Sequence, residues 1–224
     1  MIRRDYILRM IEEFAQALRQ LQASKQRLHW DEADTLLEAE LKRLAGEGRS
    51  RLLLMSETEL LAQILKNGPT HLVREKVFML ASLFQEAGDL AVRQDRLREG
   101  RACYLRALHL ILDPLAKADE AEVPEFVPKV QILREALRDS PLPPEVEAAL
   151  MQHYERMSQF DKAEDCLFAL FEADPENEAI VSFGIAFYER LSRHSDKALE
   201  AGGLPRTEVE EGLLEFRRRL GHRS

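Results

Sequence analysis

Apolar residues recur at helical spacing from the start of the chain. Between residues 3 and 23, the apolar positions are separated by alternating steps of four and three residues. They are Ile7, Ile11, Phe14, Leu18 and Leu21. Such steps place the side chains on one face of an α-helix, and that face must be buried. We expect it to pack against the next helix, and the heptad-like spacing leaves the seam of a homodimer as the less favoured alternative.

The same periodicity predicts helices along most of the remaining chain. Their expected ranges are 30–45, 56–65, 70–93, 97–112, 126–138, 145–157, 160–173 and 177–192, with a last helix from Thr207 onward. Ser56 and Glu59 form a capping box, and Thr207 with Glu210 forms another. Asp113-Pro114 is expected to stop the helix before it. Since no segment alternates with a period of two, the predicted fold class is all-α.

Two breaks suggest how the chain is organised. Asn67-Gly68-Pro69 interrupts the helical pattern, and the proline-rich segment 139–144 is typical of a linker. We therefore expect an N-terminal helical hairpin and short helix over 1–68. Repeats with C-terminal capping helices then follow over 69–224, within one continuous domain. The sequence leaves open whether residues 46–70 form a helix or a loop.

Two segments of the chain align with each other at an offset of 63 residues. Gly88, Leu97, Gly100, Tyr104 and Ala107 correspond to Met151, Phe160, Ala163, Leu167 and Leu170, and both segments end in Asp-Pro. This pattern resembles the tetratricopeptide repeat, in which a small residue lets two helices cross closely and a proline ends the second helix. A weaker match involves Trp30, Ala33 and Leu37. The predicted architecture is a tetratricopeptide-like stack of helix hairpins with capping helices, because a single hairpin cannot bury its own faces.

A narrower resemblance covers almost the whole chain. It rests on the opening DYILRMIEE, the central FDKAEDCLFAL and the closing FYERLSRHSDKALEAGGLPRTEVEEGL. These segments resemble a bacterial family of tetratricopeptide-like helical proteins of unknown function, and the closing segment is the most specific. The resemblance implies a helical-repeat fold and carries no assigned activity or functional residues.

Composition and charge narrow the range of partners. The 224 residues have 45% hydrophobic and 32% charged side chains and a formal net charge of -8. This acidic balance argues against nucleic acid as a partner. Arginines do cluster near both ends, at Arg3, Arg4, Arg9, Arg217, Arg218, Arg219 and Arg223. We interpret them as charges at helix ends and in a solvated tail, and RNA binding through them is the alternative.

Cysteine usage and hydropathy suggest a cytoplasmic protein. The two cysteines, Cys103 and Cys166, lie in helical patterns and are predicted to be buried thiols in a reducing compartment. The opening acquires Glu12 and Glu13 before an apolar run develops, which is not the pattern of a signal peptide. No apolar stretch approaches the roughly 18 residues of a membrane span, so we expect no membrane partner.

The sequence has no motif typical of an active site. It lacks a phosphate-binding loop, a dinucleotide-binding glycine turn and the Gly-x-Ser-x-Gly elbow. None of the six histidines has zinc-ligand spacing, and we interpret His153 as a partner in interhelical hydrogen bonding. We therefore expect no cofactor, no metal and no enzymatic activity.

The repeats themselves indicate the candidate binding face. In tetratricopeptide proteins the first helix of each hairpin lines a groove that binds peptides. Mapping the repeats onto the chain places six polar residues on that face: Gln85, Asp89, Arg93, Gln152, Glu155 and Arg156. We therefore expect a scaffold that binds a protein or peptide of unknown identity. The alternative is a small-molecule or nucleotide sensor with a pocket between repeats.

Overall fold

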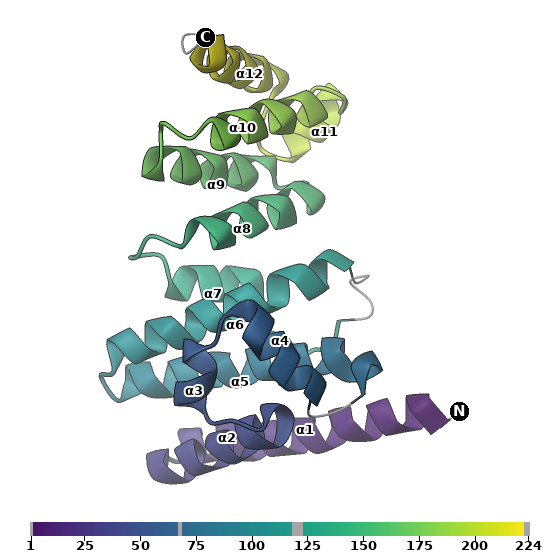
Figure 1. The fold of residues 1–224 in the computed structure, drawn as a ribbon, viewed down its shortest axis with the longest axis vertical. Helices are drawn as coiled ribbons and strands as arrows, with labels where there is room; N and C mark the ends of the chain where they lie inside the picture. Colours follow the sequence, from purple (N-terminus) through teal and green to yellow (C-terminus); the bar gives the residue numbers. More distant parts are fainter. Residues whose placement is uncertain (1, 67–68, 118–122, 222–224) are drawn as a thin grey trace. The chain divides into compact units, whose positions relative to one another are not determined.

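The computed structural model describes residues 2–66, 69–117 and 123–221 (Figure 1). Within these ranges the chain forms twelve α-helices and one short 3-10 helix, and it contains no strand. The expected all-α fold class is therefore confirmed. None of the helices in the described ranges is both long enough and apolar enough to cross a membrane.

Contacts between Cα positions divide the chain into two compact units, residues 1–141 and 142–224. This division falls inside the proline-rich segment 139–144, which has the composition of a linker. The boundary expected at 68/69 falls inside the first unit, and residues 67 and 68 lie outside the described part of the chain. The two units are described separately below.

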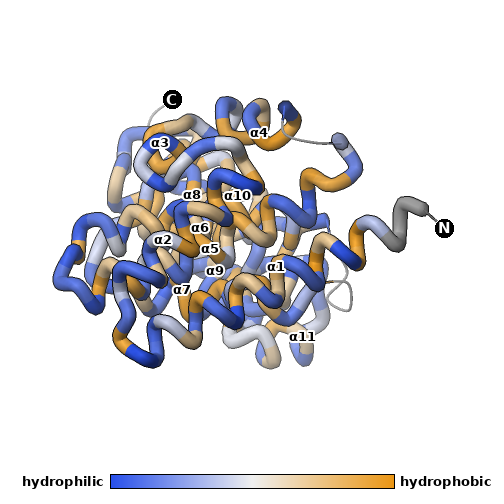
Figure 2. Tube along the Cα trace, turned by 90° about the horizontal axis from the view of Figure 1, so that it is seen from below, coloured by the Kyte–Doolittle hydropathy of each residue, from blue (hydrophilic) through white to orange (hydrophobic). Residues whose placement is uncertain are grey.

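The first unit begins with a hairpin of α1 (Ile2–Gln26) and α2 (Trp30–Ala45), close to the predicted helices. Figure 2 shows the alternation of apolar and polar residues along α1. Its residues Met10, Phe14, Leu18 and Leu21 are buried within this unit and Ile11 is half-buried, whereas Tyr6 and Leu8 are about half exposed, at 54% and 49%. The expected helix–helix packing of this face is therefore confirmed for its C-terminal part. Gly46 ends α2 in the left-handed conformation, with φ of 77°.

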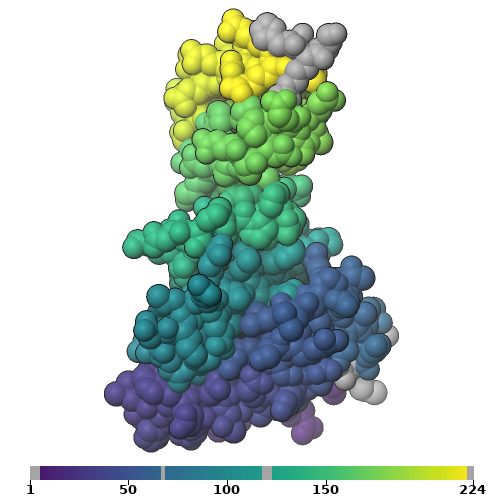
Figure 3. Space-filling view, turned by 60° about the vertical axis from the view of Figure 1, so that its left-hand side comes forward, coloured from purple at the N-terminus to yellow at the C-terminus, as the bar shows by residue number. Residues whose placement is uncertain are grey.

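Residues 46–70, which the sequence left open, contain two short helices, α3 (Arg49–Leu54) and α4 (Glu57–Lys66). The predicted capping box starts α4: the Ser56 backbone N–H donates to Glu59 Oε2 at 2.8 Å, and the Glu59 N–H donates to Ser56 Oγ at 3.3 Å. In Figure 3 the blue surface of these helices adjoins the teal surface of the helices that follow. They pack on α5 and α6 through buried leucines and isoleucine, namely Leu52, Leu60 and Ile64.

The centre of the first unit is the hairpin of α5 (Val73–Arg93) and α6 (Leu97–Lys117), preceded by a 3-10 turn, η1 (Thr70–Leu72). Helix α5 is buried on most sides because it contacts α1, α2, α4 and α6. It supplies much of the core through Phe78, Leu80, Phe84 and Leu90. A helix that is apolar on most of its circumference is suited to such a central position.

Two helix boundaries in this unit differ from the predictions. The expected stop at Asp113-Pro114 is wrong, because α6 continues through Pro114 to Lys117. Proline removes one helical hydrogen bond, but the turn before it is buried, and Lys117 Nζ pairs with Asp113 across it at 2.7 Å. The helix expected over 126–138 is shorter, because α7 (Val130–Ala136) begins only after Pro128. A residue that precedes proline disfavours helical backbone angles.

The second unit starts with the hairpin of α8 (Pro144–Arg156) and α9 (Phe160–Ala173), in agreement with the predicted pair. Helix α10 (Glu178–Leu191) follows, and its N-cap Asn177 accepts a hydrogen bond from the Ala179 N–H at 3.0 Å. The chain ends with α11 (Asp196–Ala201) and α12 (Arg206–Gly221). A Cβ on Gly184 would overlap the ring of Phe216, so glycine permits the close contact of α10 with α12.

The predicted cap of the last helix is also wrong. Thr207 lies inside α12, one residue after its start at Arg206. The Pro205 carbonyl already accepts bonds from the Glu208 and Val209 N–H groups. Arg206 fixes this start, because its guanidinium donates to the Ser192 carbonyl at 2.9 Å and to Asp196 Oδ1 at 2.8 Å.

Candidate functional site

Three of the predicted site residues lie on one face of α5 in the first unit. Gln85, Asp89 and Arg93 follow one another at steps of four residues, and their exposure increases along the helix. Gln85 and Asp89 are half-buried, while Arg93 is exposed. The helix therefore brings these three side chains into one row, and of the three Gln85 lines the groove of this unit.

Gln85 lines a groove of about 220 Å³ between α1, α5 and residues 125–132. Ser82 Oγ ties this segment to α5 by donating to the Phe126 carbonyl at 2.9 Å, and the rings of Phe14 and Phe126 pack edge to face at 4.9 Å. The groove combines apolar and polar groups. Its other lining residues are Leu18, Gln22, Ser82, Glu86, Glu125, Phe126, Val127, Pro128, Lys129 and Ile132.

A network of charged groups shares Glu86 with the lining of this groove. Lys25, which is 8% exposed, forms an ion pair with Glu86 and a second with Asp89 Oδ2 at 3.0 Å. Tyr104 donates to Asp89 Oδ1 at 2.8 Å. Burial raises the pKa of the Tyr104 phenol, and the bond to Asp89 raises it further. Both carboxylate oxygens of Asp89 are thus engaged within the unit, so its main effect is to hold α1, α5 and α6 together.

The other three predicted residues lie on α8 in the second unit. Gln152 and Arg156 are exposed. Glu155 accepts two hydrogen bonds from Arg190 on α10, at 2.6 and 2.7 Å. The bidentate bond to Glu155 holds the pKa of Arg190 above its ordinary value. Each set of three residues is gathered on its own helix, and the two sets belong to different units.

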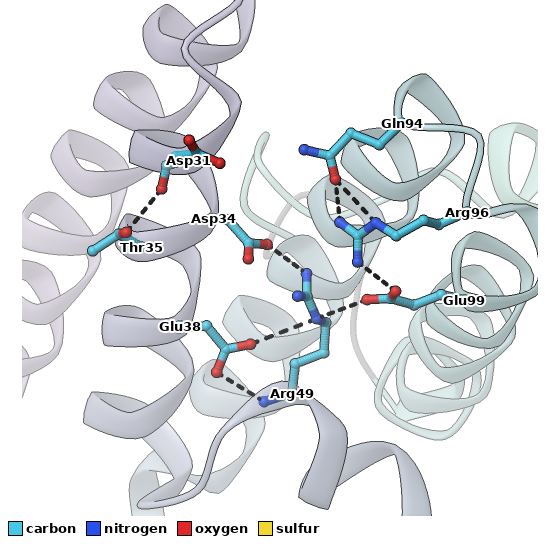
Figure 4. Close-up of polar contacts among 8 residues, drawn as sticks. All are labelled: Asp31, Asp34, Thr35, Glu38, Arg49, Gln94, Arg96 and Glu99. Atoms are coloured by element: carbon cyan, nitrogen blue, oxygen red, sulfur yellow. Dashed lines mark hydrogen bonds and ion pairs between the residues drawn. The ribbon is translucent and has the colours of Figure 1, made fainter.

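A buried arginine at the start of α3 was not predicted from the sequence. Arg49 is 7% exposed and lies among three carboxylates (Figure 4). Its guanidinium contacts Asp34 at 2.9 Å, Glu99 at 3.1 Å and Glu38 at 3.5 Å. Burial opposes its charge, but Asp34 and the other two carboxylates outweigh burial and raise the pKa of Arg49. A second arginine, Arg96, directly before α6, pairs with Glu99 and so extends the cluster to the turn between α5 and α6.

This arginine cluster joins α2, α3 and α6. The spacing of Asp34 and Glu38, one turn apart on α2, could have indicated an acidic patch. Their cationic partner could not be predicted, because the turn at Gly46–Gly48 separates it from α2 and sets its direction. We interpret the cluster as a structural clamp, because its ion pairs tie these three helices together.

The thiols and the predicted core histidine are buried. Burial raises the pKa of the Cys103 thiol to about 12, which disfavours the nucleophilic thiolate. Cys166 is also buried, in agreement with the sequence analysis. His153 is buried, but the predicted interhelical bond is missing at Nδ1, which has no hydrogen-bond partner. Burial lowers the pKa of His153, and the nearby charge of Arg156 adds to this effect.

Arginines near the chain ends contact acidic or aromatic side chains. Arg9 pairs with Glu13 at 3.0 Å, and Arg217 pairs with Glu189 at 2.7 Å. The Arg219 guanidinium lies over the Phe171 ring at 4.3 Å. The side chains of Arg3, Arg4 and Arg223 lie outside the described residues. Across the described ranges, no group of three or more histidine, cysteine, aspartate or glutamate side chains is arranged to hold a metal ion.

These features define an all-α protein built from packed helix hairpins. The chain belongs to a family described as a family of unknown function (DUF6483), whose model matches residues 1–221. The resemblance to a family of unknown function over almost the whole chain is confirmed to that extent. No curated protein and no solved structure matches the chain.

Proposed function

We propose that this protein is a non-enzymatic, tetratricopeptide-like scaffold that binds a protein or peptide. The observation that carries the proposal is the groove beside Gln85, on the face of α5 that the repeat pattern assigns to binding. It is a concave surface with apolar and polar walls, at the first helix of a hairpin.

The packing of the two hairpins supports the repeat assignment. A Cβ on Gly88 would lie 2.5 Å from Tyr104 Cε1, and one on Gly100 would lie 2.7 Å from Val92 Cγ2. Small residues therefore allow α5 and α6 to cross closely. In the α8–α9 hairpin the aligned positions Phe160 and Ala163 are buried. Both features agree with the role of small and aromatic positions in tetratricopeptide repeats.

The chemistry of the groove favours a peptide side chain over a whole small molecule. Its volume of about 220 Å³ is below the roughly 300 Å³ at which typical ligand pockets begin. Ile132 stands at its edge with 52% of its surface exposed, beside the charged residues Glu125 and Lys129. An apolar side chain of the partner would fill the groove, and the polar rim would bond to its backbone.

Replacement of Ile132 by glutamate tests this assignment. Ile132→Glu places a charge against the apolar wall, so recovery of the partner in a pull-down from the native host should fall about tenfold or more. Leu54→Glu is the matched control, since Leu54 is 80% exposed on α3 and does not line the groove. Equal recovery with both variants would remove the groove from the proposal.

The homodimer expected through α1 is a separate proposal. From Met10 onward the apolar face of α1 packs against other helices of the first unit. Among the described residues before Met10, Tyr6 and Leu8 are exposed and would contact the second copy of the chain. The small-molecule alternative is supported by a different pocket, which is described next.

A further inference from the structure

A second pocket of the first unit lies between α1, α2 and α5. Its volume is about 420 Å³, within the range of roughly 300–1,000 Å³ typical of small-ligand pockets. It shares no lining residue with the groove beside Gln85. Binding of a ligand in this pocket would therefore not depend on whether the groove beside Gln85 binds a peptide.

The residues that line this pocket have an excess of positive charge, whereas the chain as a whole is negatively charged. The formal net charge of the protein is -8. Here, three cationic side chains, Arg9, Arg43 and Lys76, line the pocket with one carboxylate, Glu13, and a second carboxylate, Glu40, pairs with Arg43, which leaves an excess of one positive charge. A pocket with excess positive charge in an acidic protein concentrates small anions and disfavours cations.

Lys76 is the buried member of this group. It is 6% exposed, and its Nζ donates to the Leu44 carbonyl 3.4 Å away, at the C-terminal end of α2. Burial lowers the pKa of Lys76, and the charge of Arg43 lowers it further. Two cations thus act on the same small volume. An anion bound beside Lys76 would favour the charged form of its side chain.

The two arginines stand nearer the solvent. Arg43 is held by Glu40 at 2.7 Å and keeps 39% of its side chain exposed. Arg9 is 79% exposed and pairs with Glu13 at 3.0 Å. The Nε and Nη2 groups of Arg43 already donate to Glu40 Oε2 at 3.0 and 2.7 Å, so an oxyanion would bond to its Nη1 edge, whereas Lys76 acts as a point charge.

We propose that this pocket binds a small organic oxyanion, either a carboxylate or a phosphate. Lys76 and Arg43 would bind the charged group from two sides. Tyr6, Met10 and Leu44 also line the pocket and would contact the apolar part of the ligand. Arg9 lies at the rim and attracts the anion.

Isothermal titration calorimetry with the full chain at low salt tests the proposal, with pyrophosphate and malonate as probes. At least one of the two should bind saturably, and the tighter one identifies the phosphate or the carboxylate class. Arg43→Gln should weaken that binding about tenfold, and Lys76→Met should abolish it. Arg19→Gln is the matched control, because this exposed arginine of α1 does not line the pocket.

Two results would overturn the proposal. One is the absence of saturable binding of both probes to the wild-type protein. The other is an affinity of Arg43→Gln that equals that of Arg19→Gln. If Lys76→Met does not fold, Arg43→Gln decides the matter, because its side chain lies at the surface and its loss leaves the core unchanged.

Discussion

At the scale of single residues, the first unit depends on buried cations whose partners are distant in the sequence. Lys25 meets Glu86 and Asp89 from another helix, and Arg49 meets Asp34 and Glu99. A buried charge is costly unless it is paired, so loss of one partner leaves the others uncompensated. Periodicity predicted that Gln85, Asp89 and Arg93 share a face. It could not predict that Asp89 is already bonded inside the unit.

Arg49 provides the first test at this scale. Arg49→Met leaves three carboxylates near one another without their shared cation. It should lower the free energy of unfolding by about 2 kcal/mol, less than for a fully buried pair because these carboxylates keep about a third of their exposure. Urea unfolding followed by circular dichroism measures the change. Arg51→Met, at an exposed position of the same helix, is the control. A loss no larger than that of the control would contradict the clamp.

His153 gives a test that depends on pH. Its pKa is lowered in the folded protein by burial and by Arg156, whereas the unfolded chain has an ordinary pKa of about 6.5. As the pH falls below this value, the unfolded chain binds a proton that the folded protein does not. The contribution of His153 to the free energy of unfolding should therefore be complete above a pH of about 6.5 and decrease below that pH.

Urea unfolding between pH 7.5 and 5 measures this effect. His153→Gln should flatten the decrease, because glutamine has no proton to take up. His71→Gln, at an exposed histidine, should leave the decrease unchanged. Identical pH profiles for the wild type and His153→Gln would show that His153 is not protonated differently in the two states.

At the scale of helices, close crossings depend on glycine at particular positions. Gly88 and Gly100 bring α5 and α6 together, and Gly184 and Gly212 bring α10 and α12 together against Phe216 and Tyr188. An aromatic ring occupies the space of the missing side chain at Gly88, Gly184 and Gly212. The hairpins are therefore held by the fit of small residues to large ones.

Gly88 tests this fit. In an open helix, glycine to alanine stabilises by up to about 1 kcal/mol. Gly88→Ala should instead destabilise by about 1–3 kcal/mol, because the new methyl group overlaps the Tyr104 ring. Thermal or urea unfolding gives the sign. In a double-mutant cycle with Tyr104→Leu the effect should shrink, since the smaller side chain frees the space. A stabilising Gly88→Ala would be inconsistent with the crossing described here.

The sequence predicted the helices best where a regular apolar period lies between clear breaks. Helices α2, α8 and α9 and the box of Ser56 with Glu59 were predicted correctly. The errors lie where tertiary contacts override a local signal. Helix α6 continues through Pro114 because the turn before this proline is packed in the core. Helix α12 begins before Thr207 because of the hydrogen bonds that Arg206 makes. Helix α11 was not predicted, because its six residues are too few to show a period.

At the scale of the whole molecule, the protein is a member of a family of unknown function with two compact helical units. The groove beside Gln85 was indicated by the repeat pattern, since the pattern names the face of α5. The pocket of Arg43 and Lys76 was not, because it forms where α1, α2 and α5 meet and no local motif marks it. Predictions of sites from sequence were thus limited to single helices.

If the protein is a scaffold, it should be bound to another polypeptide in its own host. Native mass spectrometry of the protein, purified gently from its own host, tests this most directly. We predict a discrete additional mass that proteolysis and sequencing assign to a second polypeptide, and that is lost from Ile132→Glu but retained by Leu54→Glu. A bare monomer or homodimer in every preparation would contradict the claim.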